Sequence, residues 1–456
     1  MRDGDRLSVT LPEPVAAVLA GLAGIGEEAA LVGGCVRDLL RGEPPADWDV
    51  ATSAPPDLVA ASFPGSSWQN PFGTVTVLIP DVERGIEVTT YRIEGSYRDR
   101  RRPDHVRWGR SLVDDLARRD FTMNAMAWLP EEAKGIGRLV DPFGGADDLE
   151  RGLLRAVGDP DARFAEDALR LVRAVRFATR FEQRIDPATE AAIRRHAGTV
   201  STLSGERLRG ELLRVLSGPT PPSGAFLLME ELGLLKVLVP ELAALRGVPQ
   251  AKTLPGDALD HSLRAMDALP GTDPTLRLAG LLHDLGKATT LADGHFIGHE
   301  VAGADLAEAL LRRLRFPRGE ILRVRRLVRQ HMFAYGAEWT DAAVRRFIRR
   351  VGVDLLDDLF ALRAADDLAS GFTQPPRGGL AELASRVFAA VADDPLDARQ
   401  LAVDGHILAA QLGISPGPAI GRLLSRLLEA VLDDPSLNDR EALIGLARSW
   451  AASEPG

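Results

Sequence analysis

The segment LVGGCVRDLLRGEPPADWDVAT, residues 31–52, decides the fold of this chain. A short apolar run reaches Gly33 and Gly34, and the residues after them predict a helix that carries Arg37. Two glycines let a backbone approach a triphosphate without interference from Cβ atoms. Free N–H groups at the start of the following helix favour anions. The first half of the segment therefore indicates a phosphate-binding turn, with a plain glycine turn as the alternative.

The second half of the segment ends in two acids, Asp47 and Asp49, on either side of Trp48. Side chains alternate along a strand, so a strand here places both carboxylates on the same side. Two carboxylates this close are costly without a cation, which indicates Mg²⁺ and phosphoryl chemistry. A solvated acidic loop is the alternative for the pair alone.

Together the two halves resemble the signature of the polymerase-β-type nucleotidyltransferases. The specific resemblance is to the class II group, which contains bacterial tRNA nucleotidyltransferases (CCA-adding enzymes) and poly(A) polymerases. Four later segments extend the resemblance in the order of the family's motifs: RRDFTMNA at 118–125, DPFGG at 141–145, EDALR at 166–170 and GERLRGE at 205–211.

This resemblance implies a two-metal transfer reaction in which Asp47 and Asp49 hold Mg²⁺ ions. Alternation in residues 86–91 makes Glu87 a candidate third acid, with a solvent-facing strand residue as the alternative. The nucleotide-binding residues that we predict are Gly33, Gly34, Arg37, Arg119, Asp120, Asn124, Glu166, Asp167, Arg170, Arg173 and Arg176.

The fourth motif suggests how bases are chosen without a template. Apolar spacing predicts a helix over 166–180, which places Asp167 and Arg170 on one face. A carboxylate accepts from an exocyclic amine and a guanidinium donates to a ring acceptor, a combination that suits cytosine and adenine. An ordinary ion pair within the helix is the alternative. The charged loop 97–105 corresponds to a flexible family loop, and its full length argues against an enzyme that adds only CC.

A second group of residues lies further along the chain. Residues 277–287 predict an apolar helix with His283 and Asp284 in its middle, and buried polar groups of this kind require a partner. The pattern resembles the HD phosphohydrolase superfamily, with these metal ligands: His261, His283, Asp284, His299, His331 and Asp366. The resemblance implies a divalent transition metal such as Mn²⁺ or Ni²⁺ and hydrolysis of small phosphate esters or damaged tRNA ends. A degenerate domain kept for helix packing is the alternative.

Composition agrees with a soluble chain of several domains. The sequence has 456 residues, 45% of them hydrophobic, a formal net charge of −10 and one cysteine. No disulfide within the chain is possible, and no apolar stretch resembles a signal peptide or a membrane span, so a bacterial cytoplasm fits best. We predict an α/β head (1–150) with strands near 29–33, 47–51, 74–79 and 86–92, followed by an all-α neck and RNA-binding body (151–250), an HD domain (251–375) and a tRNA-contacting tail (376–456).

The leading functional prediction is addition or repair of the 3′-terminal CCA of tRNA, with CTP and ATP as substrates. An A-adding tRNA nucleotidyltransferase and a poly(A) polymerase share the same chemistry and stay open as alternatives. A phosphohydrolase in which the HD domain carries the main activity, and an RNA-binding protein with an inactive head, are the further classes. The sequence leaves the oligomeric state open.

Overall fold

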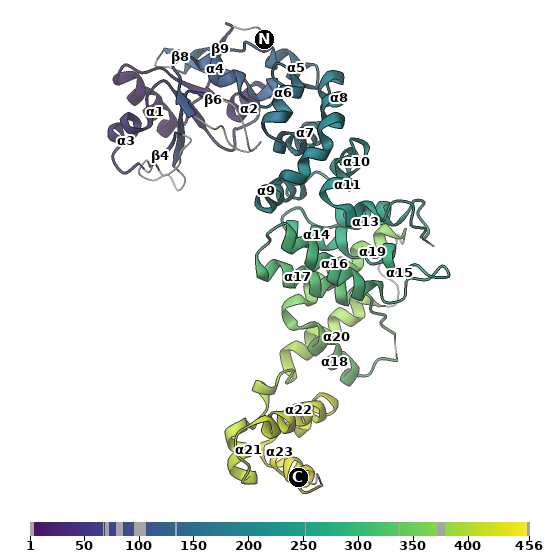
Figure 1. Ribbon diagram of the computed structural model, residues 1–456. Coiled ribbons are helices and arrows are strands. Elements are labelled where there is room, and N and C mark those ends of the chain that lie inside the picture. The colour runs from purple at the N-terminus through teal and green to yellow at the C-terminus, as the bar shows by residue number, and fades with distance from the viewer. Residues whose placement is uncertain are drawn as a thin grey trace. The chain divides into compact units, whose positions relative to one another are not determined.

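The computed structural model describes residues 4–66, 68, 73–78, 85–94, 106–132, 135–250, 252–336, 338–371 and 379–453 (Figure 1). The loop 97–105 lies outside the described residues. The chain divides into two compact units, one of residues 1–215 with 224–240 and one of residues 216–223 with 241–456. The finer division into four domains stays a prediction.

A seven-stranded mixed sheet forms the core of the first unit, in the order β1-β9-β8-β2-β3-β5-β4. Its strands are β1 Arg6–Ser8, β2 Ala29–Val32, β3 Asp49–Thr52, β4 Thr74–Val77, β5 Ile86–Thr90, β8 Ala127–Glu132 and β9 Ile136–Val140. β3 and β5 pair in parallel, and the other neighbours are antiparallel. All four strands expected near the N-terminus are present.

The central strand β2 is buried on both faces because helices cover each side of the sheet. Leu31 packs in a core with Val18 and Leu22 of α1. Its neighbours Ala30 and Val32 belong to a second core on the opposite face. The helices and short strands around the sheet are α1 Glu13–Gly24, α2 Gly34–Leu40, α3 Pro56–Ser62, β6 Arg92–Glu94, β7 Val106–Trp108, α4 Leu112–Ala117, η1 Thr122–Asn124 and α5 Gly145–Glu150.

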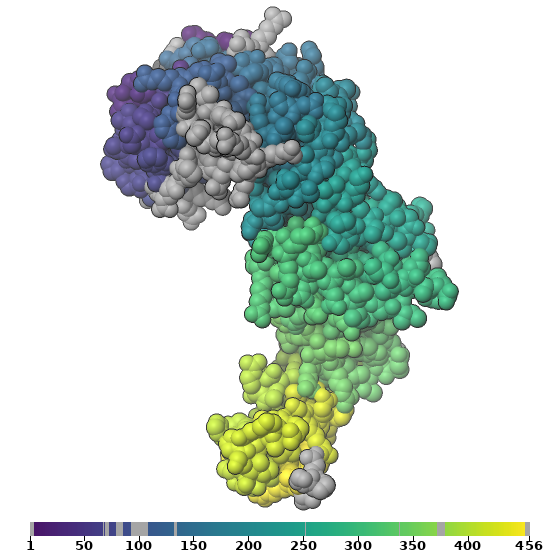
Figure 2. Space-filling model, in the orientation of Figure 1, coloured from purple at the N-terminus to yellow at the C-terminus, as the bar shows by residue number. Residues whose placement is uncertain are grey.

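The rest of the first unit is mostly helical, and the purple-to-blue head packs directly against its teal helices (Figure 2). Its elements are β10 Leu153–Leu154, α6 Pro160–Glu166, α7 Leu169–Arg180, β11 Arg184–Ile185, α8 Pro187–His196, η2 Ala197–Thr202, α9 Gly205–Leu216, α10 Ser223–Glu231 and α11 Leu235–Leu238. Helix α12 Pro240–Ala243 begins at the last residue of this unit, and its other residues belong to the second unit. The single helix predicted over 166–180 is wrong at its start. Asp167 is extended, with φ −148° and ψ 106°, and its carboxylate accepts the N–H of Leu169 at 3.0 Å, which begins a new helix.

All regular elements in the described part of the second unit are helices, apart from an isolated β-bridge between Ala292 and His295. Its elements are α13 Ala258–Asp267, α14 Pro274–Leu282, α15 Lys287–Thr290, α16 His299–Arg313, α17 Arg318–Gln330, α18 Asp341–Val351, η3 Val353–Leu355, α19 Leu356–Ala369, α20 Leu380–Asp393, η4 Ala398–Gln400, α21 Gly405–Leu412, α22 Pro418–Asp433, η5 Pro435–Leu437 and α23 Arg440–Ser453. Among the described residues, no helix combines the length and the apolar character that crossing a membrane requires.

The position of the His-Asp pair differs from the sequence prediction. His283 caps the C-terminal end of α14, and Asp284 lies beyond the helix, so the pair is not in its middle. The helix ends there because the chain turns toward α15. The Nδ1 atom of His283 lies 2.7 Å from the carbonyl oxygen of Gly280 in the last turn.

Candidate active site

Strand pairing brings the candidate acids of the head together. Asp49 is the first residue of β3, and its register partner on the parallel strand β5 is Glu87. Paired residues in neighbouring strands project to the same face of a sheet. Asp47 lies in the bend before β3, so the prediction that strand alternation aligns it with Asp49 is wrong.

The three acids are close enough for the charges of Asp47 and Glu87 to act on Asp49. Burial raises the pKa of Asp49, Arg119 opposes the rise, and the charges of Glu87 and Asp47 add to it. Like-charged carboxylates that disfavour one another's ionised form are a fitting donor set for divalent cations.

At the glycine turn, the side chain of Arg119 lies close to the backbone of Gly33. Gly33 has φ 76°, and a Cβ atom added there would lie 2.6 Å from Nη1 of Arg119. The N–H of Gly33 donates to the carbonyl oxygen of Met126, the residue before β8, at 3.0 Å. A larger residue at position 33 would therefore displace the arginine that faces the acids.

Arg37 on α2 is buried and linked to the second motif. Its Nε and Nη2 atoms donate to Asp38 at 2.9 and 2.7 Å, and its Nη1 atom donates to Asn124 at 2.7 Å. Asn124 in turn donates to Asp120 at 3.3 Å. Asp38 and Asn124 therefore hold the Arg37 guanidinium from two sides.

The same network continues into the neck. Asp120 accepts Nε of Arg173 on α7 at 2.7 Å. Glu211 on α9, which is 1% exposed, accepts Nε of Arg176 at 2.6 Å and lies 3.9 Å from Arg173. Residues from the first, second and fifth motifs, together with Arg173 and Arg176 of α7, thus form one connected set of polar contacts.

Asp115 on α4 is a site residue that the sequence analysis missed. It is fully buried, and it pairs with Arg118 at 2.6 Å and with Arg119 at 3.3 Å. Burial alone raises the pKa of Asp115, but the two arginines lower it below its usual range. Its spacing of three and four residues from Arg118 and Arg119 is the signal that could have found it.

The candidate base-reading residues are arranged differently from the prediction. Asp167 pairs with Arg207 on α9 at 2.6 Å instead of sharing a helix face with Arg170. Arg170, which is 9% exposed, donates to Glu166 at 2.6 Å and to the carbonyl oxygen of Arg118 at 2.7 Å. Because a turn separates Asp167 from α7, tertiary contacts and not helix periodicity place the two side chains.

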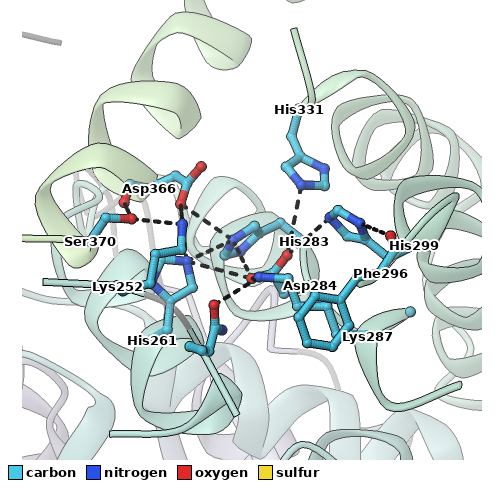
Figure 3. A network of polar contacts seen from close by, with 12 residues as sticks. Lys252, His261, His283, Asp284, Lys287, Phe296, His299, His331, Asp366 and Ser370 are labelled. Carbon is cyan, nitrogen blue, oxygen red and sulfur yellow. Dashed lines mark hydrogen bonds and ion pairs between the residues drawn. The ribbon is translucent and has the colours of Figure 1, made fainter. Parts of the chain in front are cut away.

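The HD residues converge from helices α13, α16 and α19, from the C-terminal ends of α14 and α17, and from the turn after α14 (Figure 3). They include two groups of three residues, and within each group the potential ligand atoms lie within 4.8 Å of one another. The first group is His261, His283 and Asp366, and the second is His283, Asp284 and His331. His299 Nε2 lies 3.4 Å from Asp284. All six residues predicted as metal ligands are therefore brought together.

Three of the histidines are oriented by backbone carbonyl oxygens just before them in the chain. In His283, His299 and His331 the Nδ1 atom lies 2.7, 2.8 and 2.7 Å from a carbonyl oxygen three residues earlier. Each Nε2 atom then points toward the centre, and in His299 and His331 it is buried with no hydrogen-bond partner among the described residues. An imidazole held at one nitrogen and open at the other is the usual form of a metal ligand.

Charge also favours a cation at this centre. Burial alone raises the pKa of Asp284, but His283, His299 and Lys287 hold it well below its usual range. Burial and the charge of His283 lower the pKa of His331 to about 3. The carboxylate is thus ionised and the imidazole neutral at pH 7, which are the states that bind metals.

Two lysines beside the centre were missed by the sequence analysis. Lys287 donates to Asp284 at 2.6 Å, and Lys252 donates to Ser370 at 2.8 Å and lies 3.5 Å from Asp366. Both line a cavity of about 350 Å³. Of the 55 lysines and arginines in the chain, only positions 134, 236, 252 and 287 are lysines, a bias that could have drawn attention to this pair.

Three models of known protein families match consecutive stretches of this chain. Residues 29–155 match the poly A polymerase head domain, residues 184–245 match the probable RNA and SrmB-binding site of polymerase A, and residues 259–371 match the HD domain. The matches cover both the head and the HD centre.

Relatives that match over nearly their whole length are A-adding or CCA-adding enzymes. The chain is 37% identical to an A-adding tRNA nucleotidyltransferase of Deinococcus radiodurans, over 94% of this chain and 96% of the relative. It is 33% identical to a CCA-adding enzyme of Limosilactobacillus reuteri, over 95% of each. The crystal structure of the Bacillus stearothermophilus CCA-adding enzyme in complex with CTP matches with a TM-score of 0.69 and 28% identity, over 97% of this chain and 99% of that one. The chain belongs to the tRNA nucleotidyltransferase family of CCA-adding enzymes, with a poly(A) polymerase-type head and an HD domain.

Proposed function

We propose that this chain adds or repairs the 3′-terminal CCA of tRNA without a template, with CTP and ATP as substrates. The observation that carries the proposal is the register of Asp49 opposite Glu87, with Asp47 beside them, in a head of this family. Full-length CCA-adding relatives and the CTP complex of a related enzyme support the choice of reaction.

The acids of the head would hold the divalent ions. Asp47, Asp49 and Glu87 fit Mg²⁺ because they offer hard oxygen ligands whose mutual repulsion a cation relieves. When bound, such ions favour ionisation of the RNA 3′-hydroxyl and neutralise the departing pyrophosphate. The protein contributes the placement of these carboxylates and of Arg119, which faces Asp49.

The triphosphate would lie at the turn of Gly33 and Gly34. The Arg37 guanidinium donates hydrogen bonds to Asp38 from one edge and to Asn124 from another, which fixes its position before a nucleotide arrives. A preorganised donor costs little reorganisation in the transition state. Arg119 is the second cation at this turn.

Base selection would rest on Asp167 and Arg170, with Glu166 orienting the arginine. The arrangement supports this role in a new form, because Arg207 and not the helix holds Asp167. The carboxylate suits the exocyclic amines of cytosine and adenine, and uracil and guanine present a carbonyl there. Arg173 and Arg176 then act on the nucleotide or RNA through the network of Asp120 and Glu211.

The deciding experiment uses three tRNAs that end at the discriminator base, at C and at CC. Each is incubated with the protein and with CTP and ATP, singly and together. We expect all three to be completed to CCA. Extension of only the CC-ended tRNA with ATP would instead make the chain an A-adding enzyme, and long A tracts on any RNA would make it a poly(A) polymerase.

A second function is favoured by the HD centre. We propose that it binds a divalent transition metal such as Mn²⁺ or Ni²⁺ and hydrolyses small phosphate esters or damaged tRNA ends. The buried Nε2 atoms of His299 and His331, which make no hydrogen bond within the described part of the chain, and the two lysines at the cavity support this activity. A bound metal would supply an activated water, and the lysines would hold the phosphate.

Hydrolysis is measured with 2′,3′-cyclic nucleotides and simple phosphate esters in the presence of Mn²⁺ or Ni²⁺. We expect turnover by the unmodified protein and its loss in His283→Ala. Binding of metal, read by calorimetry, should fall in the same variant. Metal binding without turnover would leave the centre with a structural role, and no binding would end the proposal.

A further inference from the structure

Two phenylalanines at the end of α7 form an aromatic pair beside α2. The rings of Phe177 and Phe181 stack with centroids 6.0 Å apart and planes 18° from parallel. In the described part of the chain, five guanidinium carbons lie 5.9 Å or less from one of these two centroids: those of Arg37, Arg41, Arg173, Arg176 and Arg180.

The ring of Phe181 is the meeting point for three of these cations. Arg37 lies 4.3 Å from its centroid, Arg41 4.9 Å and Arg180 5.5 Å. The electron-rich face of an aromatic ring attracts a guanidinium, whereas three cations without such a face repel one another. Phe181 therefore offsets a local excess of positive charge next to the glycine turn.

The pKa of the neighbouring Glu43 reflects the positive charge of these three arginines. Glu43 accepts Nη2 of Arg41 at 2.8 Å. The hydrogen bond and charge of Arg41 lower the pKa of Glu43, and the charges of Arg37 and Arg180 lower it further. The three arginines thus act on one small region, although Arg180 comes from a different helix.

Phe181 adds a contact with the face of the Arg37 guanidinium to the hydrogen bonds at its edges. Asp38 and Asn124 bind the edges of the guanidinium, and hydrogen bonds in the plane do not by themselves fix the tilt of that plane. The ring covers one face, so the remaining N–H groups keep a single direction. Arg37 is 7% exposed, so water screens this contact weakly.

We propose that Phe181 is a positioning residue for nucleotide binding, because its ring holds the guanidinium of Arg37 in the orientation that meets the triphosphate. The inference rests on the proposed triphosphate role of Arg37. Phe181 directly follows α7, and Arg170 lies near the start of that helix. The contact consequently connects the helix that carries a base-reading residue to the helix that carries a phosphate-binding residue.

The test compares Phe181→Leu and Phe181→Met with Phe181→Trp in the full chain. Leucine and methionine fill the space without an aromatic face, and tryptophan keeps that face. We expect the first two to raise KM for CTP and for ATP by the same factor, between about 3-fold and about 30-fold, with kcat unchanged. The inhibition constant of pyrophosphate should rise equally, and Phe181→Trp should stay within about twofold of the unmodified enzyme.

Two controls separate positioning from packing. Thr179→Ala changes the same turn of α7, where the hydroxyl donates to the carbonyl oxygen of Val175, and it should leave KM unchanged. In an Arg37→Lys background, Phe181→Leu should add little, because the planar partner of the ring is gone.

Three results would overturn the inference. They are an unchanged KM in both Phe181→Leu and Phe181→Met, an equal rise in KM in all three variants, and a fall in kcat with KM unchanged. Failure of the unmodified protein to extend any of the three tRNAs would instead overturn the proposed function on which the inference rests. The two failures are therefore distinguishable in the same assay.

Discussion

At the scale of single residues, Asp49 shows a conflict between stability and chemistry. Burial and two neighbouring acids raise its pKa, so its ionised form is less favourable in the folded protein than in the unfolded chain. The ionised carboxylate therefore costs stability in the absence of a cation. Such a cost is expected of a carboxylate whose proposed role is to bind a cation.

Replacing Asp49 by Asn should raise the unfolding temperature of the metal-free protein and abolish nucleotide addition. Activity should fall by a factor on the order of 10³, because one of the carboxylates proposed to hold Mg²⁺ is lost. The gain in unfolding temperature should be present at pH 7 in EDTA and should disappear as the pH falls below about 4, where the carboxyl of the unmodified protein is protonated in both states. Calorimetry at both pH values checks this, and a lower unfolding temperature at pH 7 would contradict it.

At the scale of elements, Asp167 lies at the break between α6 and α7. There its structural contacts can be tested apart from its proposed role in base selection. One carboxylate oxygen caps Leu169 at the start of α7, and the other pairs with Arg207 on α9. The asparagine side chain keeps an oxygen for the cap and loses the charge. The alanine side chain loses both.

Asp167→Ala should therefore lower the free energy of unfolding by about 1 kcal/mol more than Asp167→Asn, as measured by urea denaturation. Both variants should lose the preference for CTP and ATP over UTP and GTP in single-nucleotide incorporation. Retained base choice in Asp167→Asn would show that this residue serves the neck alone. Arg195→Gln, at an exposed ion pair with Asp161, is a matched control that should change neither quantity.

At the scale of the whole molecule, the two candidate centres belong to different compact units. The acids of the head lie in the first unit and the HD ligands lie in the second. Each centre draws its ligands from its own unit, so local changes in one are not expected to remove ligands from the other.

Crossed variants should therefore show independent activities. Asp49→Asn should keep the hydrolysis of phosphate esters with Mn²⁺ or Ni²⁺, and His283→Ala should keep the rate of CCA addition within about twofold, since sites without shared partners behave additively. Parallel assays of both variants on tRNA and on a cyclic nucleotide measure this. Loss of both activities in either variant would show that the two units are coupled.

Local sequence patterns were enough for several features. Strands β2, β3, β4 and β5 follow from alternating or continuous apolar residues, and the predicted fold class is confirmed. The six HD ligands also meet as predicted. The roles of individual site residues, the four-part division and the cytoplasmic location stay predictions.

What the sequence by itself determined is the set of groups available to each centre, because strand periodicity, glycine turns and adjacent acids act over a few residues. Only the tertiary structure decided which groups meet. Arg37 binds Asn124 across 87 positions, Arg176 binds Glu211 across 35, and Lys252 binds Ser370 across 118. The break at Asp167 has the same origin, since its carboxylate serves the cap of α7 and a distant arginine at once. A buried charge takes the partner that packing brings near, and no local pattern specifies that partner.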